Sequence, residues 1–127
     1  EIQVVVPLHP RTRNILQQMN LQPAFTIIDP VGYFDMIMLL KHCKLVVTDS
    51  GGVQKEAFFF GRHCITLREQ TEWVELVEHG FNRIVGTNTD LLQEAFQYFS
   101  SKKSDFTVDL YGSGRAAERA VGEVLEM

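Results

Sequence analysis

Short apolar runs alternate with amphipathic stretches along this 127-residue sequence, and this alternation constrains the fold more than any other feature. Each apolar run has the length and composition of a buried strand. The stretches between the runs place apolar residues at helical spacing. We predict strands at residues 2–7, 25–28, 45–48, 64–67 and 83–85, and helices at residues 12–19, 33–43, 53–60, 72–78, 91–99 and 115–125.

The connections between these elements are only a few residues long. Short connections between alternating strands and helices favour parallel strands joined by crossover helices. We therefore predict an α/β fold with a doubly wound, Rossmann-like parallel sheet, in a chain that has the size of one domain. The sequence opens at Glu1 without a methionine and enters a strand almost at once, so we expect a fragment of a longer protein.

Composition excludes several classes of function. The hydrophobic share of 45%, the charged share of 22% and the net charge of −4 are ordinary for a globular protein. We expect neither a nucleic-acid nor a membrane partner, because the charge is slightly acidic and no apolar run is long enough to span a bilayer. Cys43 and Cys64 are interpreted as two reduced core thiols rather than a disulfide or a metal pair, which favours the cytoplasm.

A Ser-Gly-Gly turn, Thr48-Asp49-Ser50-Gly51-Gly52, follows the third predicted strand. Ligands of open parallel sheets bind beyond the carboxyl ends of the strands. A helix that starts there presents unpaired N–H groups and a positive partial charge. The two glycines let a ligand approach these amides closely, and the Ser50 hydroxyl adds a donor. The turn predicts a diphosphate site at Ser50, Gly51 and Gly52.

The same turn also fits a purely structural role, in which glycine permits unusual backbone angles and Ser50 or Asp49 caps the helix. The turn alone leaves the two interpretations equal. It is neither a Walker A loop nor a dinucleotide-binding glycine motif. His42, His63 and His79 lack the spacing of metal ligands, so we predict no metal and no cofactor.

Glu56 favours the ligand-binding interpretation. It lies four residues after Gly52, about one turn or ~5.4 Å along the helix axis. With a phosphate at the helix start, this displacement suits the neighbouring ribose, and a carboxylate can accept hydrogen bonds from both ribose hydroxyls. The alternative is a glutamate that only complements the helix dipole.

Residues 48–57, Thr-Asp-Ser-Gly-Gly-Val-Gln-Lys-Glu-Ala, closely resemble the signature of the non-hydrolysing UDP-N-acetylglucosamine 2-epimerases. The resemblance continues in order over almost the whole chain, and the ordered series is more specific than any single motif. The other similar elements are Pro7-Leu8-His9-Pro10, Asp29-Pro30 with Tyr33, Leu67-Arg68 with Thr71-Glu72 and Glu75, Val85-Gly86-Thr87, and Tyr111-Gly112 through Gly114.

This resemblance implies that residues 1–127 are the C-terminal, UDP-binding domain of a two-domain protein with a GT-B-type fold. It implies an isomerase that eliminates UDP from a UDP-2-acetamido sugar and adds it back with C2 inverted. The family's acid and base carboxylates belong to the N-terminal domain, so we expect no catalytic residue here. The implied partners are UDP, the UDP-sugar, the N-terminal domain of the same protein and, for the intact protein, a second copy in a homodimer.

The resemblance also assigns site residues. It implies that Ser50, Gly51 and Gly52 hold the diphosphate, and that Glu56 holds the ribose. Met36 stands where some relatives stack an aromatic ring on uracil. His9 matches a histidine that faces an additional regulatory UDP-GlcNAc site in some members. Taken alone, His9 also fits a strand-end histidine that is hydrogen-bonded to the backbone.

Two residues near the predicted site each allow two interpretations of their role. Arg68, at the end of a strand, is either a cation for the leaving diphosphate or a solvated surface residue. Trp73 departs from the common Thr-Glu-Arg-Pro-Glu pattern and resembles a subgroup acting on modified sugars, but it also fits a buried anchor at a helix start. The competing functions are the nucleotide-sugar domain of a GT-B glycosyltransferase and a stand-alone binding module.

Overall fold

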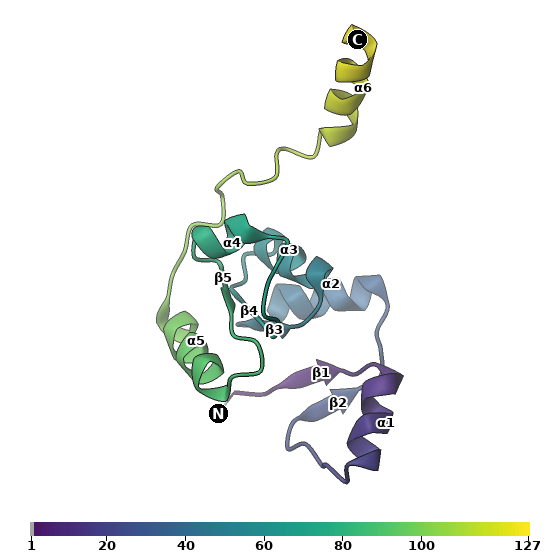
Figure 1. The fold of residues 1–127 in the computed structure, drawn as a ribbon, viewed down its shortest axis with the longest axis vertical. Helices are drawn as coiled ribbons and strands as arrows, with labels where there is room; N and C mark the ends of the chain where they lie inside the picture. Colours follow the sequence, from purple (N-terminus) through teal and green to yellow (C-terminus); the bar gives the residue numbers. More distant parts are fainter. Residues whose placement is uncertain (1) are drawn as a thin grey trace. The chain divides into compact units, whose positions relative to one another are not determined.

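The computed structural model describes residues 2–127, in which strands and helices alternate as far as α5 (Figure 1). The strands are β1 (Val5–Pro7), β2 (Thr26–Ile28), β3 (Val46–Thr48), β4 (Cys64–Thr66) and β5 (Asn82–Ile84). The helices are α1 (Pro10–Gln18), α2 (Tyr33–His42), α3 (Gly51–Phe59), α4 (Val74–Glu78), α5 (Thr89–Ser101) and α6 (Ala116–Glu126). Each predicted element is present, with ends displaced by a few residues at most.

Every strand pair among the described residues is parallel, which confirms the predicted α/β class. Strand β1 pairs with β2, and β4 lies between β3 and β5. The strands form a two-stranded and a three-stranded sheet, where the sequence predicted a single sheet. The chain divides in the same way into two compact units, a first unit that ends at His42 and a second unit, Cys43–Met127.

Three helices begin two residues earlier than predicted, because each follows a residue whose side chain caps it. His9 before α1, Ser50 before α3 and Asn88 before α5 each accept a hydrogen bond from a backbone N–H of the first turn. Such a cap satisfies one of the N–H groups that a helix start leaves unpaired. Helix α3 ends before Gly61, whose positive φ of 68° is the left-handed conformation that glycine adopts without strain.

The core of the second unit is built around β4, whose three residues are all buried. One cluster joins β4 to α5 through Ile65, Val85, Ala95 and Phe99. A second cluster joins α3, α4 and the start of β5, and its buried members are Phe58, Leu76 and Phe81. Figure 1 shows α5 on one side of strands β3–β5 and α3 on the other. The two clusters fix the helices that border the carboxyl ends of these strands.

The Phe58-Phe59-Phe60 run contributes one ring to this core. Phe58 is buried, whereas Phe59 is 57% exposed and Phe60 is half-buried. Three consecutive residues of a helix point in different directions, so one face of α3 cannot bury all three rings.

Neither Cys43 nor Cys64 forms a disulfide, as predicted. Cys64 on β4 is 1% exposed and Cys43 is half-buried. Burial raises the pKa of the Cys64 thiol to about 12, and it also raises the pKa of Cys43. The thiolate is the reactive form, so both raised values make these cysteines unreactive at neutral pH.

We expect Cys64 to resist iodoacetamide at pH 8 in the folded chain and to react after unfolding in urea. With a pKa near 12, only about one Cys64 thiol in 10⁴ is ionised at pH 8, and burial also blocks access. Peptide mass spectrometry after timed labelling measures the modification at each cysteine. Labelling of folded Cys64 at the rate of an unhindered thiol would contradict this assignment.

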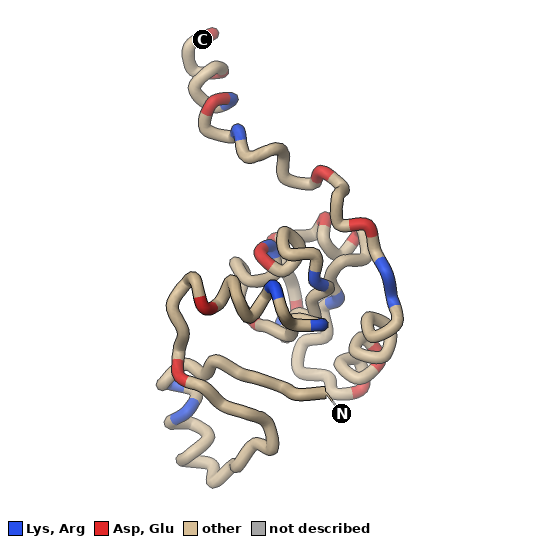
Figure 2. The backbone as a smooth tube through the Cα atoms, turned by 180° about the vertical axis from the view of Figure 1, so that it is seen from behind, with Lys and Arg blue, Asp and Glu red and all other residues tan. Residues whose placement is uncertain are grey.

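Charges of both signs are spread along the backbone (Figure 2). The net charge of −4 results from 16 acidic and 12 basic residues. Among residues 2–127, no helix has the length and apolar character that crossing a membrane requires.

Candidate functional site

The Ser-Gly-Gly turn lies at the carboxyl end of β3, where the sequence predicted it. Because β3, β4 and β5 are parallel, the segments that follow each strand emerge at the same edge of the three-stranded sheet. Residues 67–73 follow β4 at this edge, and they bring Arg68 to the turn. The Arg68 Nη1 atom lies 3.6 Å from the position that a Gly51 Cβ would occupy. The structure therefore places Arg68 beside the predicted diphosphate site.

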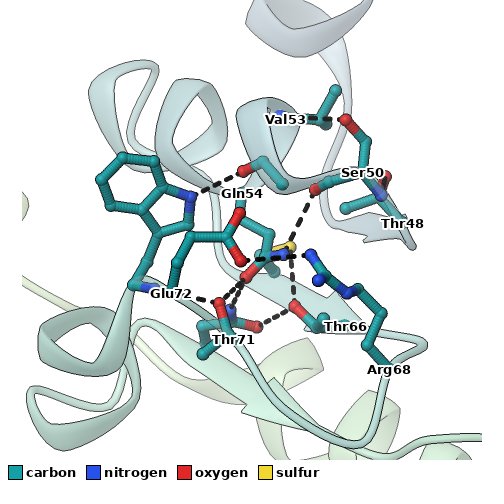
Figure 3. Close-up of polar contacts among 12 residues, drawn as sticks. Thr48, Ser50, Val53, Gln54, Thr66, Arg68, Thr71 and Glu72 are labelled. Atoms are coloured by element: carbon teal, nitrogen blue, oxygen red, sulfur yellow. Dashed lines mark hydrogen bonds and ion pairs between the residues drawn. The ribbon is translucent and has the colours of Figure 1, made fainter.

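Ser50 is the N-cap of α3 (Figure 3). Its hydroxyl oxygen accepts a long, 3.5 Å hydrogen bond from the Val53 N–H, and its own N–H donates to Thr48 Oγ1 at 3.0 Å. As an acceptor in this cap, the hydroxyl keeps its proton available for a further acceptor. The capping role and the ligand-binding role are therefore compatible in one side chain.

The two glycines of the turn have different surroundings. A Cβ added to Gly52 would meet no heavy atom within 4 Å, so the space next to this residue is open. A Cβ added to Gly51 would collide with the Glu72 carboxylate. The Glu72 carboxylate is the end of a flexible, 47% exposed side chain that can move away from a Cβ, so the fold itself strictly requires glycine at neither position.

Arg68 forms an ion pair with Glu72, with Nη1 and Oε2 3.2 Å apart (Figure 3). The side chains are 37% and 47% exposed, and ion pairs this exposed contribute little to stability. The guanidinium is thus held next to the helix start by a weak contact that an anionic ligand could replace. From the sequence, Glu72 was recognised only as part of a motif. Its proximity to Gly51 depends on the path of the chain after β4.

Glu56 lies on α3 and is half-buried. Its side chain has no hydrogen-bond or ion-pair partner within residues 2–127. A carboxylate near a surface without a protein partner has its acceptor oxygens available for a ligand. The ribose role remains a prediction, and the position one turn beyond Gly52 agrees with it.

His9 and Met36 belong to the first unit. His9 caps α1, and its Nδ1 accepts a hydrogen bond from the Arg11 N–H at 3.2 Å, which is the backbone-satisfied role considered for it. Met36 is half-buried on α2. Their roles in substrate binding stay predictions.

Trp73 is an anchor of the turn. Its indole N–H donates to the Gly51 carbonyl at 2.8 Å, and its ring packs against the cluster that contains Phe58 and Leu76. The ammonium group of Lys55 lies 4.7 Å from the centre of the indole ring and 4.5 Å from that of Tyr111. These contacts favour the anchoring interpretation of Trp73 that the sequence left open.

A buried polar network beside the turn was not predicted. Gln54 is fully buried on α3, and its Oε1 accepts from Thr71 Oγ1 at 2.6 Å and from Asn82 Nδ2 at 3.0 Å. Asn82 Oδ1 in turn accepts from Thr66 Oγ1 at 2.9 Å. The signal in the sequence was Thr66 inside a predicted buried strand and Gln54 inside a predicted helix, whereas Asn82 lay just before the predicted fifth strand. Buried polar groups require such partners.

The described residues contain no group of three or more side chains that could hold a metal ion. What the second unit offers instead is a set of backbone amides, one hydroxyl, one guanidinium and one carboxylate at the edge of a parallel sheet. Such an arrangement is typical of α/β proteins that bind phosphate-containing ligands at a helix start.

Comparison with known proteins identifies the family. Residues 1–125 match the family model described as UDP-N-acetylglucosamine 2-epimerase, and the chain belongs to this family. It is 52% identical over 116 residues to the UDP-2,3-diacetamido-2,3-dideoxy-D-glucuronate 2-epimerase of Pseudomonas aeruginosa, covering 91% of this chain and 33% of that protein. It is 40% identical over 124 residues to the UDP-N-acetylglucosamine 2-epimerase of Methanocaldococcus jannaschii, covering 93% of this chain and 34% of that protein.

Solved structures agree with the sequence comparison. The crystal structure of the M. jannaschii UDP-GlcNAc 2-epimerase in complex with UDP-GlcNAc and UDP superimposes with a TM-score of 0.86 at 38% identity, covering 98% of this chain and 36% of that chain. The GT-B-type α/β fold class implied by the sequence resemblance is thereby confirmed. The chain spans about a third of the length of the curated relatives that it matches.

Proposed function

We propose that this chain is the UDP-binding part of a UDP-2-acetamido-sugar 2-epimerase. The observation that carries the proposal is the helix start at Ser50-Gly51-Gly52, with open space next to Gly52 and the Arg68 guanidinium beside Gly51. Oriented amides and a cation stabilise the negative charge of a diphosphate. Glu56 holds the ribose, one turn further along α3. In the first unit, we propose substrate-binding roles for Met36, at the uracil, and for His9, at an additional UDP-GlcNAc site.

The reaction that this site serves is an elimination followed by an addition. A base removes the proton from C2 of the sugar, the C1–O bond to UDP breaks, and a C1–C2 double bond forms. UDP then adds back to C1, and a proton adds to the opposite face of C2. The second unit contributes to both steps by stabilising the charge that develops on the diphosphate as the C1–O bond breaks, because preorganised amides and a cation need little reorganisation.

The proposed substrate class is a UDP-2-acetamido sugar, including modified ones. Support for a modified sugar is the 52% identity to the P. aeruginosa enzyme, whose name specifies a diacetamido uronate, together with Trp73 in place of the arginine of the common pattern. Mass spectrometry of the intact parent enzyme with candidate UDP-sugars in heavy water tests both substrate and reaction. We expect one deuterium at C2 of the epimerised product. Epimerisation without deuterium at C2 would contradict the elimination mechanism.

The remaining parts of the proposal concern the setting of the reaction. The intact protein would carry an N-terminal domain with the acid and base carboxylates and would form a homodimer. The two reduced thiols support a cytoplasmic protein, and the net charge of −4 supports one without a nucleic-acid partner.

We expect the 127-residue chain by itself to show no epimerase activity on any UDP-2-acetamido hexose. The physical reason is that a C2 proton requires a positioned base, and the proposed site supplies only binding groups. A coupled assay with the purified chain, run beside an intact relative as the positive control, measures the turnover. Turnover at the rate of the intact relative would contradict the division of roles between the two domains.

A further inference from the structure

Two side chains hold consecutive backbone carbonyls of the phosphate-binding turn. Gln54 Nε2 donates to the Ser50 carbonyl at 3.2 Å, and Trp73 Nε1 donates to the Gly51 carbonyl at 2.8 Å (Figure 3). The two donors come from different parts of the second unit, one from α3 and one from the segment after β4. They converge on the two peptide units that contain the glycine amides.

The geometry of a peptide unit links these carbonyls to the proposed site. In a trans peptide, the C=O and the N–H point in opposite directions within one plane. The Ser50 carbonyl shares its peptide unit with the Gly51 N–H, and the Gly51 carbonyl shares its unit with the Gly52 N–H. A donor that fixes either carbonyl therefore also fixes the direction of the following amide.

These two peptide units need such a restraint more than others. The first N–H groups of a helix have no partner within the helix. Glycine has the widest backbone freedom, so adjacent glycines increase the number of orientations that the amides can adopt. The backbone bonds of the first turn of α3 already restrain both carbonyls, and the side-chain donors add a second hydrogen bond to each. The tighter restraint leaves less ordering for a ligand to impose when it binds.

We propose that Gln54 and Trp73 are positioning residues that aim the Gly51 and Gly52 amides at the diphosphate. This inference rests on the proposed function, and it adds how the site is preorganised. Neither side chain touches the ligand in this scheme. Each acts through a backbone carbonyl.

The contacts of Gln54 fix the direction of its amide group. Its Oε1 already accepts from Thr71 Oγ1 and Asn82 Nδ2, so Nε2 is the end that faces the Ser50 carbonyl. Asn82 is held in turn by Thr66 on β4. The orientation of the Ser50–Gly51 peptide is therefore tied to strands β4 and β5, in the buried centre of the unit.

Trp73 is fixed by its own set of contacts. Its backbone N–H donates to Thr71 Oγ1 at 3.1 Å, the Lys55 ammonium lies over its ring, and the Tyr111 ring meets it at an angle of 90° with centroids 5.8 Å apart. Thr71 thus contacts both positioning residues, since its hydroxyl also donates to Gln54. One threonine couples the two restraints.

Isothermal titration with UDP and with uridine distinguishes positioning from general stabilisation. Trp73→Phe keeps an aromatic ring and removes the indole donor. We expect it to weaken UDP binding by about 3- to 10-fold, the usual effect of one neutral hydrogen bond, and to leave uridine binding unchanged. The matched control is Tyr111→Phe, which keeps a ring in the same cluster and removes a buried hydroxyl that lies against Glu75 without a hydrogen bond of good geometry. This control should bind UDP like the wild type.

A measurement without ligand tests the orientation itself. The amide ¹⁵N shift of a residue responds to a hydrogen bond at the preceding carbonyl. Trp73→Phe should therefore shift the ¹⁵N resonance of Gly52. As a second variant, Gln54→Glu keeps an acceptor oxygen for Thr71 and Asn82 and replaces the Nε2 group that donates to the Ser50 carbonyl. This variant should shift the ¹⁵N resonance of Gly51. Tyr111→Phe should shift neither.

The outcomes separate this inference from the proposed function. If wild type binds UDP and Trp73→Phe binds it equally well, or loses UDP and uridine affinity alike, the positioning role is overturned and the proposed function stands. Unchanged ¹⁵N shifts at Gly51 and Gly52 in both variants would also overturn it. If the wild-type chain binds neither UDP nor pyrophosphate, the proposed function fails and the diphosphate role of these amides fails with it.

Discussion

Replacing Gly52 by valine is expected to abolish UDP binding while the chain stays folded. A Cβ at this position meets no heavy atom within 4 Å, so a side chain can start from Gly52 into open space. It would project into the open space at the start of α3, where a phosphate must approach the backbone amides. The same open space therefore lets the folded unit accept a side chain at position 52 and lets that side chain block the phosphate.

Isothermal titration with UDP, together with the thermal unfolding midpoint, measures both effects of Gly52→Val. The matched control is Gly122→Val on α6, another helical glycine whose Cβ would meet nothing within 4 Å. The control should bind UDP with wild-type affinity. If Gly52→Val binds UDP as well as the wild type does, the phosphate does not sit at this turn.

Replacing Glu56 by alanine is expected to weaken UDP binding by about 10- to 100-fold, because a hydrogen bond to a charged group contributes roughly 1.5–3 kcal/mol. The unfolding midpoint should barely change. Glu56 has no protein partner among the described residues, so its removal leaves no buried group unpaired. This combination of a large binding effect and a small stability effect is typical of a ligand contact.

The wild-type chain must bind UDP measurably, and more tightly than uridine, for this comparison. Glu94→Ala on α5 removes an exposed glutamate of the same unit and serves as the control. Equal affinity of wild type and Glu56→Ala for UDP would show that the glutamate only complements the dipole of α3. In that case Gly52→Val would still test the phosphate site on its own.

The local parts of the site could be predicted because their chemistry is encoded in neighbouring residues. Ser50, Gly51 and Gly52 are consecutive, and a helix start that follows a buried strand exposes its amides wherever such a turn occurs. The position of Glu56, one turn beyond Gly52, follows from the helical rise alone. The helix ends were displaced where a cap operates, since His9 and Asn88 cap through side chains that a pattern of apolar residues does not register.

The contacts around the turn could not be predicted, because each depends on residues far apart in the sequence. Trp73 reaches the Gly51 carbonyl across 22 positions, and Asn82 reaches Gln54 across 28. Both contacts exist only because β3, β4 and β5 are paired in one register, which brings the segments after these strands together. Sequence patterns identify a strand, but its register is a property of the assembled sheet.

The sequence by itself determined the α/β class, the order of the elements, the location of the Ser-Gly-Gly turn and the family resemblance, because strand and helix periodicity and a glycine turn are local properties. The tertiary structure alone decided that Trp73 is an anchor, that Arg68 lies beside Gly51 with Glu72, and that a buried network ties Gln54 to the sheet. These outcomes depend on packing between elements. Packing is cooperative, so the contacts between elements cannot be predicted from the sequence of any one element.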